Sequence, residues 1–182
     1  MNKFFGHLKT VCTHKWWVFY YASRVGIPGR GFIHDFSKFH PVEFFESVKY
    51  YTGTRSPIDA CKEANGVSKA WLHHKGKNSH HYEYHQDDFD NGGKPLCMPY
   101  KDTIEMLCDF LAAGRAYSGK DFTYAKEHDW WLNKSKKPLA MHPVQKKFIS
   151  KALFLASVIE DIPNESTLKE IYQECLEKYN DK

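Results

Sequence analysis

Apolar side chains recur every three or four residues along much of this sequence, and this spacing is the strongest constraint on its fold. In residues 3–24 the recurring side chains are Phe4, Leu8, Val11, Val18 and Tyr21, which would line one face of a helix. Similar patterns, with cap and turn signals, predict helices at residues 41–51, 57–64, 69–74, 100–116, 122–134, 143–160 and 166–179. No stretch alternates polar and apolar residues as a half-buried strand does. We therefore predict an all-α fold.

The chain has 182 residues, of which 42% are apolar, and this is enough to bury one large core. No linker divides the sequence, so we predict a single domain over residues 1–182. Residues 87–99 contain two glycines and two prolines among polar residues and are expected to form a surface loop. Trp130 and Trp131 are expected to lie in the core.

Charge and cysteine content narrow the functional classes. The net charge of +4 is too small to indicate nucleic-acid binding, although it suits a phosphorylated substrate. The five cysteines include no C-x-x-C pair, which favours a reducing compartment. The polar N-terminus does not resemble a signal peptide, and no apolar run approaches membrane-spanning length. We therefore expect a cytoplasmic protein with no membrane partner.

A histidine and an aspartate stand side by side in residues 31–39, which we expect to form a short helix that ends at Pro41. Its apolar residues are expected to be buried, namely Phe32, Ile33 and Phe36. A charged group in an apolar run is costly unless something compensates it. A divalent cation does so, because imidazole nitrogen and carboxylate oxygen both bind such ions. The alternative is that Asp35 caps a helix or pairs with Lys38, and that His34 is a core residue.

Seven of the eleven histidines fall in two places. They are His7 and His14, then His73, His74, His80, His81 and His85. His14 lies on the apolar face of its helix and should point inward. Asp109 lies in the apolar middle of residues 100–116 and needs a cation or an arginine, with Arg115 as the alternative partner. Separate helices thus each offer an inward histidine or aspartate, which is how helical bundles build metal sites.

The predicted metal ligands are His14, His34, Asp35, His73, His74, His80, His81 and Asp109. Glu43, one helix after the His-Asp pair, is a further candidate to bridge two ions. His85 is expected to be a bystander. The dipeptide His128-Asp129 is expected at the surface, because the flanking Lys126 and Glu127 look solvated.

The order of these residues resembles the HD-domain superfamily of metal-dependent phosphohydrolases. That family has a His on one helix, a His-Asp pair on the next and an Asp on a later helix. His14, the run His34-Asp35-Phe36-Ser37-Lys38 and Asp109 match this order within residues 7–117. The resemblance implies an HD-like helical bundle with the metal site in its core, on which the helices of residues 122–180 pack. As a whole, the chain also resembles a bacterial or phage family of uncharacterised function with a His-rich signature.

Additional histidines between the pair and the last aspartate allow a second metal in this superfamily. We prefer His74 and His80 as the additional ligands and keep His73 and His81 as alternatives. A histidine-rich surface loop is the other interpretation of this stretch.

The resemblance implies hydrolysis of a nucleotide or related phosphoester through a metal-activated water. One or two ions are expected, and the sequence does not distinguish Mn, Fe, Mg, Zn, Co and Ni. The predicted catalytic residues are Asp35, Lys38, His80 and His81, with either histidine as general acid if it is not a ligand. The predicted substrate-binding residues are Lys38, Lys77, Arg115 and Tyr82, the last as a platform for a base. An HD-fold di-iron oxygenase and a non-catalytic nucleotide- or partner-binding module are the alternatives, and the oligomeric state stays open.

Overall fold

The computed structural model describes residues 2–87 and 89–180, and it confirms the all-α prediction. Its α-helices are α1 (Lys3–Arg24), α2 (Pro28–Ile33), α3 (Pro41–Tyr50), α4 (Pro57–Asn65), α5 (Lys69–Lys75), α6 (Tyr100–Ser118), α7 (Tyr124–Ser135), α8 (Pro143–Ile159) and α9 (Glu165–Tyr179). Short 3₁₀ turns are η1 (Phe36–Phe39), η2 (Tyr82–Tyr84), η3 (Phe89–Asn91) and η4 (Gly119–Asp121). In the predicted surface loop, β1 (Gln86–Asp87) pairs antiparallel with β2 (Lys94–Pro95). Asp88, which belongs to that loop, lies outside the described residues.

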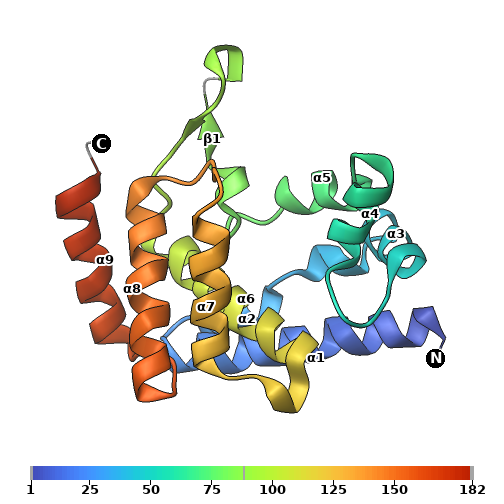
Figure 1. Ribbon diagram of the computed structural model, residues 1–182, viewed down its shortest axis with the longest axis horizontal. Coiled ribbons are helices and arrows are strands. Elements are labelled where there is room, and N and C mark those ends of the chain that lie inside the picture. Colours follow the sequence, from blue (N-terminus) through green and yellow to red (C-terminus); the bar gives the residue numbers. More distant parts are fainter. Residues whose placement is uncertain (1, 88, 181–182) are drawn as a thin grey trace.

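Helices α1 and α6 pack along each other, and α7, α8 and α9 stand side by side next to them (Figure 1). One continuous core joins these five helices. Its fully buried side chains include Val18, Tyr21, Ile104, Leu107, Leu111, Trp131, Phe148, Leu153 and Leu168. Each of the aliphatic side chains and Phe148 contributes about 1.5–3 kcal/mol by leaving water. No helix in residues 2–87 and 89–180 is long and apolar enough to cross a membrane.

Helices α3, α4 and α5 form a smaller group beside the N-terminal part of α1 (Figure 1). Phe44 of α3 packs on Phe4 of α1 with 5.1 Å between ring centroids. Glu46 of α3 accepts hydrogen bonds from the Ser68 hydroxyl, at 2.6 Å, and from the Ala70 amide, at 2.9 Å. Because Ser68 is the N-cap of α5, these bonds fix where α5 begins, and so which of its side chains face inward.

The prediction that Phe32, Ile33 and Phe36 are buried is wrong, since they are 65%, 61% and 52% exposed. The reason lies in α2, which approaches α1 through a glycine. A Cβ atom built at Gly31 would lie only 2.5 Å from Cβ of Ala22, so the buried side of this short helix is backbone. Its apolar side chains point away from that contact.

The prediction of two core tryptophans is half right. Trp131 is fully buried, whereas Trp130 is 42% exposed. The two residues are adjacent on α7, so their side chains are turned about 100° apart around the helix, and only one of them reaches α8.

Candidate metal centre

His34 and Asp35 lie at a break between α2 and η1, and the predicted helix through them is wrong. Asp35 adopts the left-handed backbone conformation, with φ 54° and ψ 29°. This conformation costs most residues about 1–2 kcal/mol, and aspartate is one of the few that tolerate it. The break turns both side chains inward, where His34 is 2% and Asp35 1% exposed.

The first group of possible ligands joins α1, the break and α6, and consists of His14, His34, Asp35 and Asp109. Nε2 of His14 lies 3.0 Å from Oδ1 of Asp109 and 3.6 Å from Oδ2 of Asp35. Nε2 of His34 lies 3.1 Å from Oδ2 of Asp35 and 3.5 Å from Oδ1 of Asp109. Two imidazole nitrogens and two carboxylates therefore converge on one point, as a divalent ion requires.

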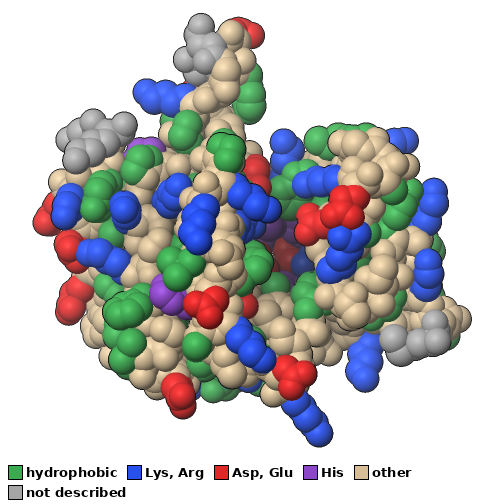
Figure 2. All heavy atoms as spheres, in the orientation of Figure 1, with side chains coloured by type: hydrophobic (Ala, Val, Ile, Leu, Met, Phe, Trp, Pro, Cys, Tyr) green, Lys and Arg blue, Asp and Glu red, His purple; other side chains and the backbone are tan. Residues whose placement is uncertain are grey.

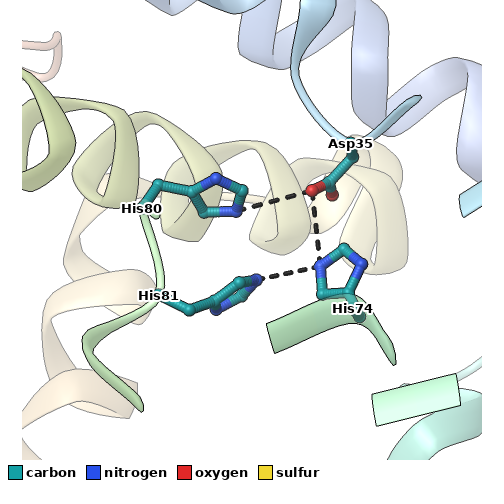
Figure 3. Close-up of side chains that lie close together, drawn as sticks. All are labelled: Asp35, His74, His80 and His81. Carbon is teal, nitrogen blue, oxygen red and sulfur yellow. Dashed lines mark hydrogen bonds and ion pairs between the residues drawn. The ribbon is translucent and has the colours of Figure 1, made fainter. Parts of the chain in front are cut away.

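The second group consists of Asp35, His74, His80 and His81 and is drawn in Figure 3. Nε2 of His74 and Nε2 of His80 lie 3.3 and 3.4 Å from Oδ1 of Asp35. Nε2 of His81 lies 2.9 Å from Nε2 of His74. Asp35 thus turns Oδ1 toward this group and Oδ2 toward the first, and it is the member that the two groups share.

Several polar atoms of the two groups lack ordinary hydrogen bonds. Although Nζ of Lys38 lies 2.6 Å from Oδ2 of Asp35, neither oxygen of Asp35 has a hydrogen bond of ordinary angle among the described residues, and nor does Nε2 of His80. Buried polar atoms are rarely left without a partner, because losing their hydration is costly. A set of buried, converging nitrogen and oxygen donors with unused lone pairs fits a divalent cation.

Glu105 holds two of the imidazoles and was not among the predicted site residues. Its Oε1 accepts from Nδ1 of His34, at 2.8 Å, and lies 3.2 Å from Nδ1 of His80. Nε of Arg30 donates to the other oxygen of Glu105 at 2.5 Å. A carboxylate that receives Nδ1–H leaves Nε2 free to bind a metal. The sequence did carry a signal, because Glu105 precedes Asp109 by four residues and so lies on the same helix face.

Glu43 plays a similar part for the second group. Its Oε2 lies 2.7 Å from Nδ1 of His74, and its Oε1 lies 2.6 Å from Nδ1 of His73. Glu43 therefore supports a ligand and is not itself among the converging donor atoms. His73 belongs to neither group, so the structure brings together seven of the eight predicted ligands and leaves His73 outside.

The neighbouring charges oppose the effect of burial on the ionisable groups here. Burial disfavours a charged His34, but Asp35, Asp109 and Glu105 together raise its pKa well above the ordinary value. Burial likewise acts against a charged Asp35, yet His34 and Lys38 hold its pKa well below the usual range. His81 differs, because burial and the adjacent His80 lower its pKa far enough to keep it neutral, which is the form that binds metal.

A chamber of about 180 Å³ adjoins the two groups and is lined by His7, His14, Lys38, His81, Asp109 and Tyr117. It adjoins a larger cleft of about 650 Å³ between α4 and α7, and His81, Asp109 and Tyr117 line both spaces. We call this larger space the outer cleft. Figure 2 shows this face of the molecule hollowed between those two helices, with histidine and acidic side chains at the bottom.

The predicted substrate-binding residues fall in different places. Lys38 lines the chamber and Tyr82 lines the outer cleft. Lys77 lines a separate opening of about 830 Å³, on which His34, Asp35 and His80 also border. Arg115 lines none of these spaces. Its Nε donates to the Tyr21 hydroxyl at 2.5 Å, and among the described residues it forms no ion pair with Asp109, whose partners are histidines.

Of the residues expected to lie outside the site, Glu127 differs from its prediction. Nε2 of His85 donates to the Ser79 carbonyl oxygen at 2.7 Å, and His85 belongs to neither ligand group. Asp129 is exposed, but Glu127, predicted to be solvated, is only 7% exposed. Burial, aided by the negative charge of Asp109, raises the pKa of Glu127 to about 7.

The fold and the site together define an all-α protein with a buried histidine–carboxylate cluster whose donor atoms fit divalent metal ions. Residues 3–154 match the model of a family described as "Family of unknown function (DUF5662)". This match covers most of the chain, and the protein belongs to that family. No curated protein and no solved structure matches the chain.

Proposed function

We propose that this protein is a metal-dependent phosphohydrolase that acts on a nucleotide or related phosphoester, as its resemblance to the HD-domain superfamily implies. The observation that carries the proposal is the position of Asp35, with one oxygen turned toward each of two ligand groups. A shared carboxylate is what a pair of neighbouring ions needs. A cytoplasmic location, expected from five cysteines that are all free, is part of the proposal.

In this proposal His14, His34, Asp35 and Asp109 hold one ion, and Asp35, His74, His80 and His81 hold the other. Bound divalent ions would activate a water molecule and neutralise charge on the phosphoryl group. His80 and His81 then serve as ligands, and the general-acid role is left to another group.

Lys38 is the residue best placed to hold a phosphoryl oxygen. It lines the chamber, and its ammonium group lies 2.6 Å from Asp35. Burial disfavours the charged lysine, but Asp35 and Asp109 raise its pKa above the ordinary value, so Lys38 is a cation at neutral pH. A lysine of this kind acts as a point charge toward phosphate.

His7 adds an uncharged polar atom to the chamber. It is 6% exposed, and its Nδ1 has no hydrogen-bond partner among the described residues. Burial and the charge of Lys38 lower the pKa of His7 to about 4, so it is neutral at pH 7. A neutral imidazole there would orient the phosphoester by a hydrogen bond without adding charge.

The test is metal analysis joined to a screen of phosphoesters. Protein purified without a histidine tag or chelator is expected to hold two divalent ions, one for each group, and to release phosphate with one of Mn, Mg, Co or Ni. Asp35→Ala should lose both the ions and the turnover, while His128→Ala, outside both groups, should keep them. An unchanged rate in Asp35→Ala would overturn the proposal. Oxygen consumption by iron-loaded protein would support an oxygenase instead.

A further inference from the structure

Glu127 is a buried carboxylate without a partner. It lies on α7, is 7% exposed, and neither of its carboxylate oxygens has a hydrogen bond or an ion pair within residues 2–87 and 89–180. A buried carboxylate without a hydrogen-bond partner destabilises the fold. Such a group calls for a ligand that completes its hydrogen bonds.

The position of Glu127 links it to the proposed catalytic site. It lines the outer cleft, together with Trp130 and Lys134 of the same helix. These residues are spaced by three and seven positions, which places them on one helix face. The outer cleft borders the chamber along His81, Asp109 and Tyr117, so a substrate whose phosphate occupies the chamber and whose leaving group extends past these residues would point toward Glu127.

The distance along α6 suits a leaving group of moderate size. A Cβ atom built at Gly114 would collide with Oε2 of Glu127 and lie 2.9 Å from Cε2 of Phe122. The carboxylate therefore rests on the backbone of α6 at Gly114, where the absence of a side chain makes room for it. Gly114 follows Asp109 by five residues, or about 7.5 Å along the helix.

The surroundings of Glu127 favour a planar ligand. Phe122 and Trp130 line the cleft beside it, and Nζ of Lys134 lies 4.9 Å from the centroid of the Trp130 ring. Aromatic side chains contact flat rings well. The cleft volume of about 650 Å³ falls within the ~300–1,000 Å³ typical of small-molecule sites.

We propose that Glu127 is the residue that determines substrate specificity, and that its carboxylate accepts hydrogen bonds from the N–H groups of a nucleobase in the outer cleft. The inference rests on the proposed phosphohydrolase function and deepens it by naming the leaving group. Two carboxylate oxygens best match a base edge with two adjacent N–H donors, as guanine has. A base with one donor fits less well, and a sugar phosphate without a base lacks the contact.

The experiment measures binding with non-hydrolysable phosphonate analogues of guanosine monophosphate, uridine monophosphate and ribose 5-phosphate. Calorimetric titration of the metal-loaded wild-type protein should show the guanosine analogue binding roughly 10–100-fold more tightly than the ribose analogue. Glu127→Leu should remove most of this preference, and Glu127→Gln, which keeps one oxygen acceptor, should retain part of it. Asp129→Asn, on the exposed side of the same helix, is the matched control and should keep the full preference.

A second variant tests the same carboxylate without replacing Glu127. Gly114→Ala leaves Glu127 in the sequence but places a methyl group where its Oε2 lies. It should lower the preference for the guanosine analogue as Glu127→Leu does, with the fold verified by circular dichroism. A preference that survives in both Glu127→Leu and Gly114→Ala would overturn the assignment.

The outcomes separate this inference from the function on which it rests. Hydrolysis of phosphoesters with a base preference unaffected by Glu127→Leu would refute the role of Glu127 and leave the phosphohydrolase standing. Binding of the guanosine analogue that depends on Glu127, without hydrolysis under any metal, would support the role of Glu127 and refute the phosphohydrolase.

Discussion

The carboxylates of the metal centre and the carboxylate of the outer cleft are buried to a similar degree but behave in opposite ways. Asp35 and Asp109 have pKa values well below the usual range, because imidazoles, and for Asp35 also Lys38, outweigh the effect of burial. The pKa of Glu127 is raised to about 7, because burial is the largest effect on it and Asp109 adds to it. Burial alone therefore does not identify a metal ligand. What distinguishes the centre is the number of donor groups within reach of each oxygen.

The largest effect is expected from removing the negative charge of Asp35, the carboxylate that the two ligand groups share. Asp35→Asn keeps the shape of the side chain but should lose both ions, whereas Asp109→Asn, which belongs to one group only, should lose one. Elemental analysis after dialysis measures both. Loss of a single ion from Asp35→Asn would contradict a shared ligand.

Glu127→Gln should stabilise the protein at high pH by roughly 3 kcal/mol, the free energy that corresponds to a pKa raised from 4.5 to about 7. The folded state binds this proton more tightly than the unfolded state. The stability that this proton contributes to the wild-type protein is therefore lost as the pH rises from 4.5 to about 7. The glutamine variant has no ionisable group at this position and does not lose stability in this way. Urea unfolding of the metal-free proteins at several pH values measures the difference, with Asp129→Asn as the control. A difference independent of pH would contradict the raised pKa.

Glu105→Gln and Glu43→Gln compare the two carboxylates that support the ligands. Glu105 contacts His34 and His80, one from each group, whereas Glu43 contacts His74 of the second group only. Loss of such a support weakens metal affinity by about 10–100-fold. Glu105→Gln should therefore weaken the binding of both ions, whereas Glu43→Gln should weaken the binding of one. Competition with a chromogenic chelator measures these affinities. Equal effects of the two variants on both ions would argue against this division.

The smallest effect is expected at His73. Its Nδ1 contacts Glu43, but it contributes no atom to either group. His73→Ala should therefore keep both ions, whereas His81→Ala should lose the ion of the second group. Elemental analysis of the two variants side by side decides this, and loss of an ion from His73→Ala would show that the second group is wrongly composed.

The sequence predicted the long elements of the fold because their signal is local. The apolar spacing of residues 3–24 and 100–116 gave α1 and α6 to within two residues. The same spacing located His14 and Asp109 on inward faces, and the structure brings them within 3.0 Å of each other. A polar residue on a strongly apolar helix face can thus be predicted from the sequence to point into the protein.

The errors arose where a distant contact overrides the local pattern. The exposure of Phe32 follows from the close approach of Gly31 to α1, and the burial of Glu127 follows from its fit over Gly114. The choice between His73 and His74 depends on the hydrogen bonds that Glu46 accepts from Ser68 and Ala70, which fix the start of α5. None of these contacts leaves a periodic trace in the sequence. The left-handed turn at Asp35 is another case, since only its backbone angles reveal it.

The contact between Gly31 and Ala22 has a consequence for the precision of the metal centre. No deformable side chain separates α2 from α1 at this point, so the main chain itself sets the spacing between the two helices. Only three residues, or about 4.5 Å of helix, separate this contact from His34. Metal sites require ligand distances held to within about 0.2 Å. A rigid contact so near the His-Asp pair fixes the position of these two residues relative to α1. Helices that pack through longer side chains would hold them less precisely.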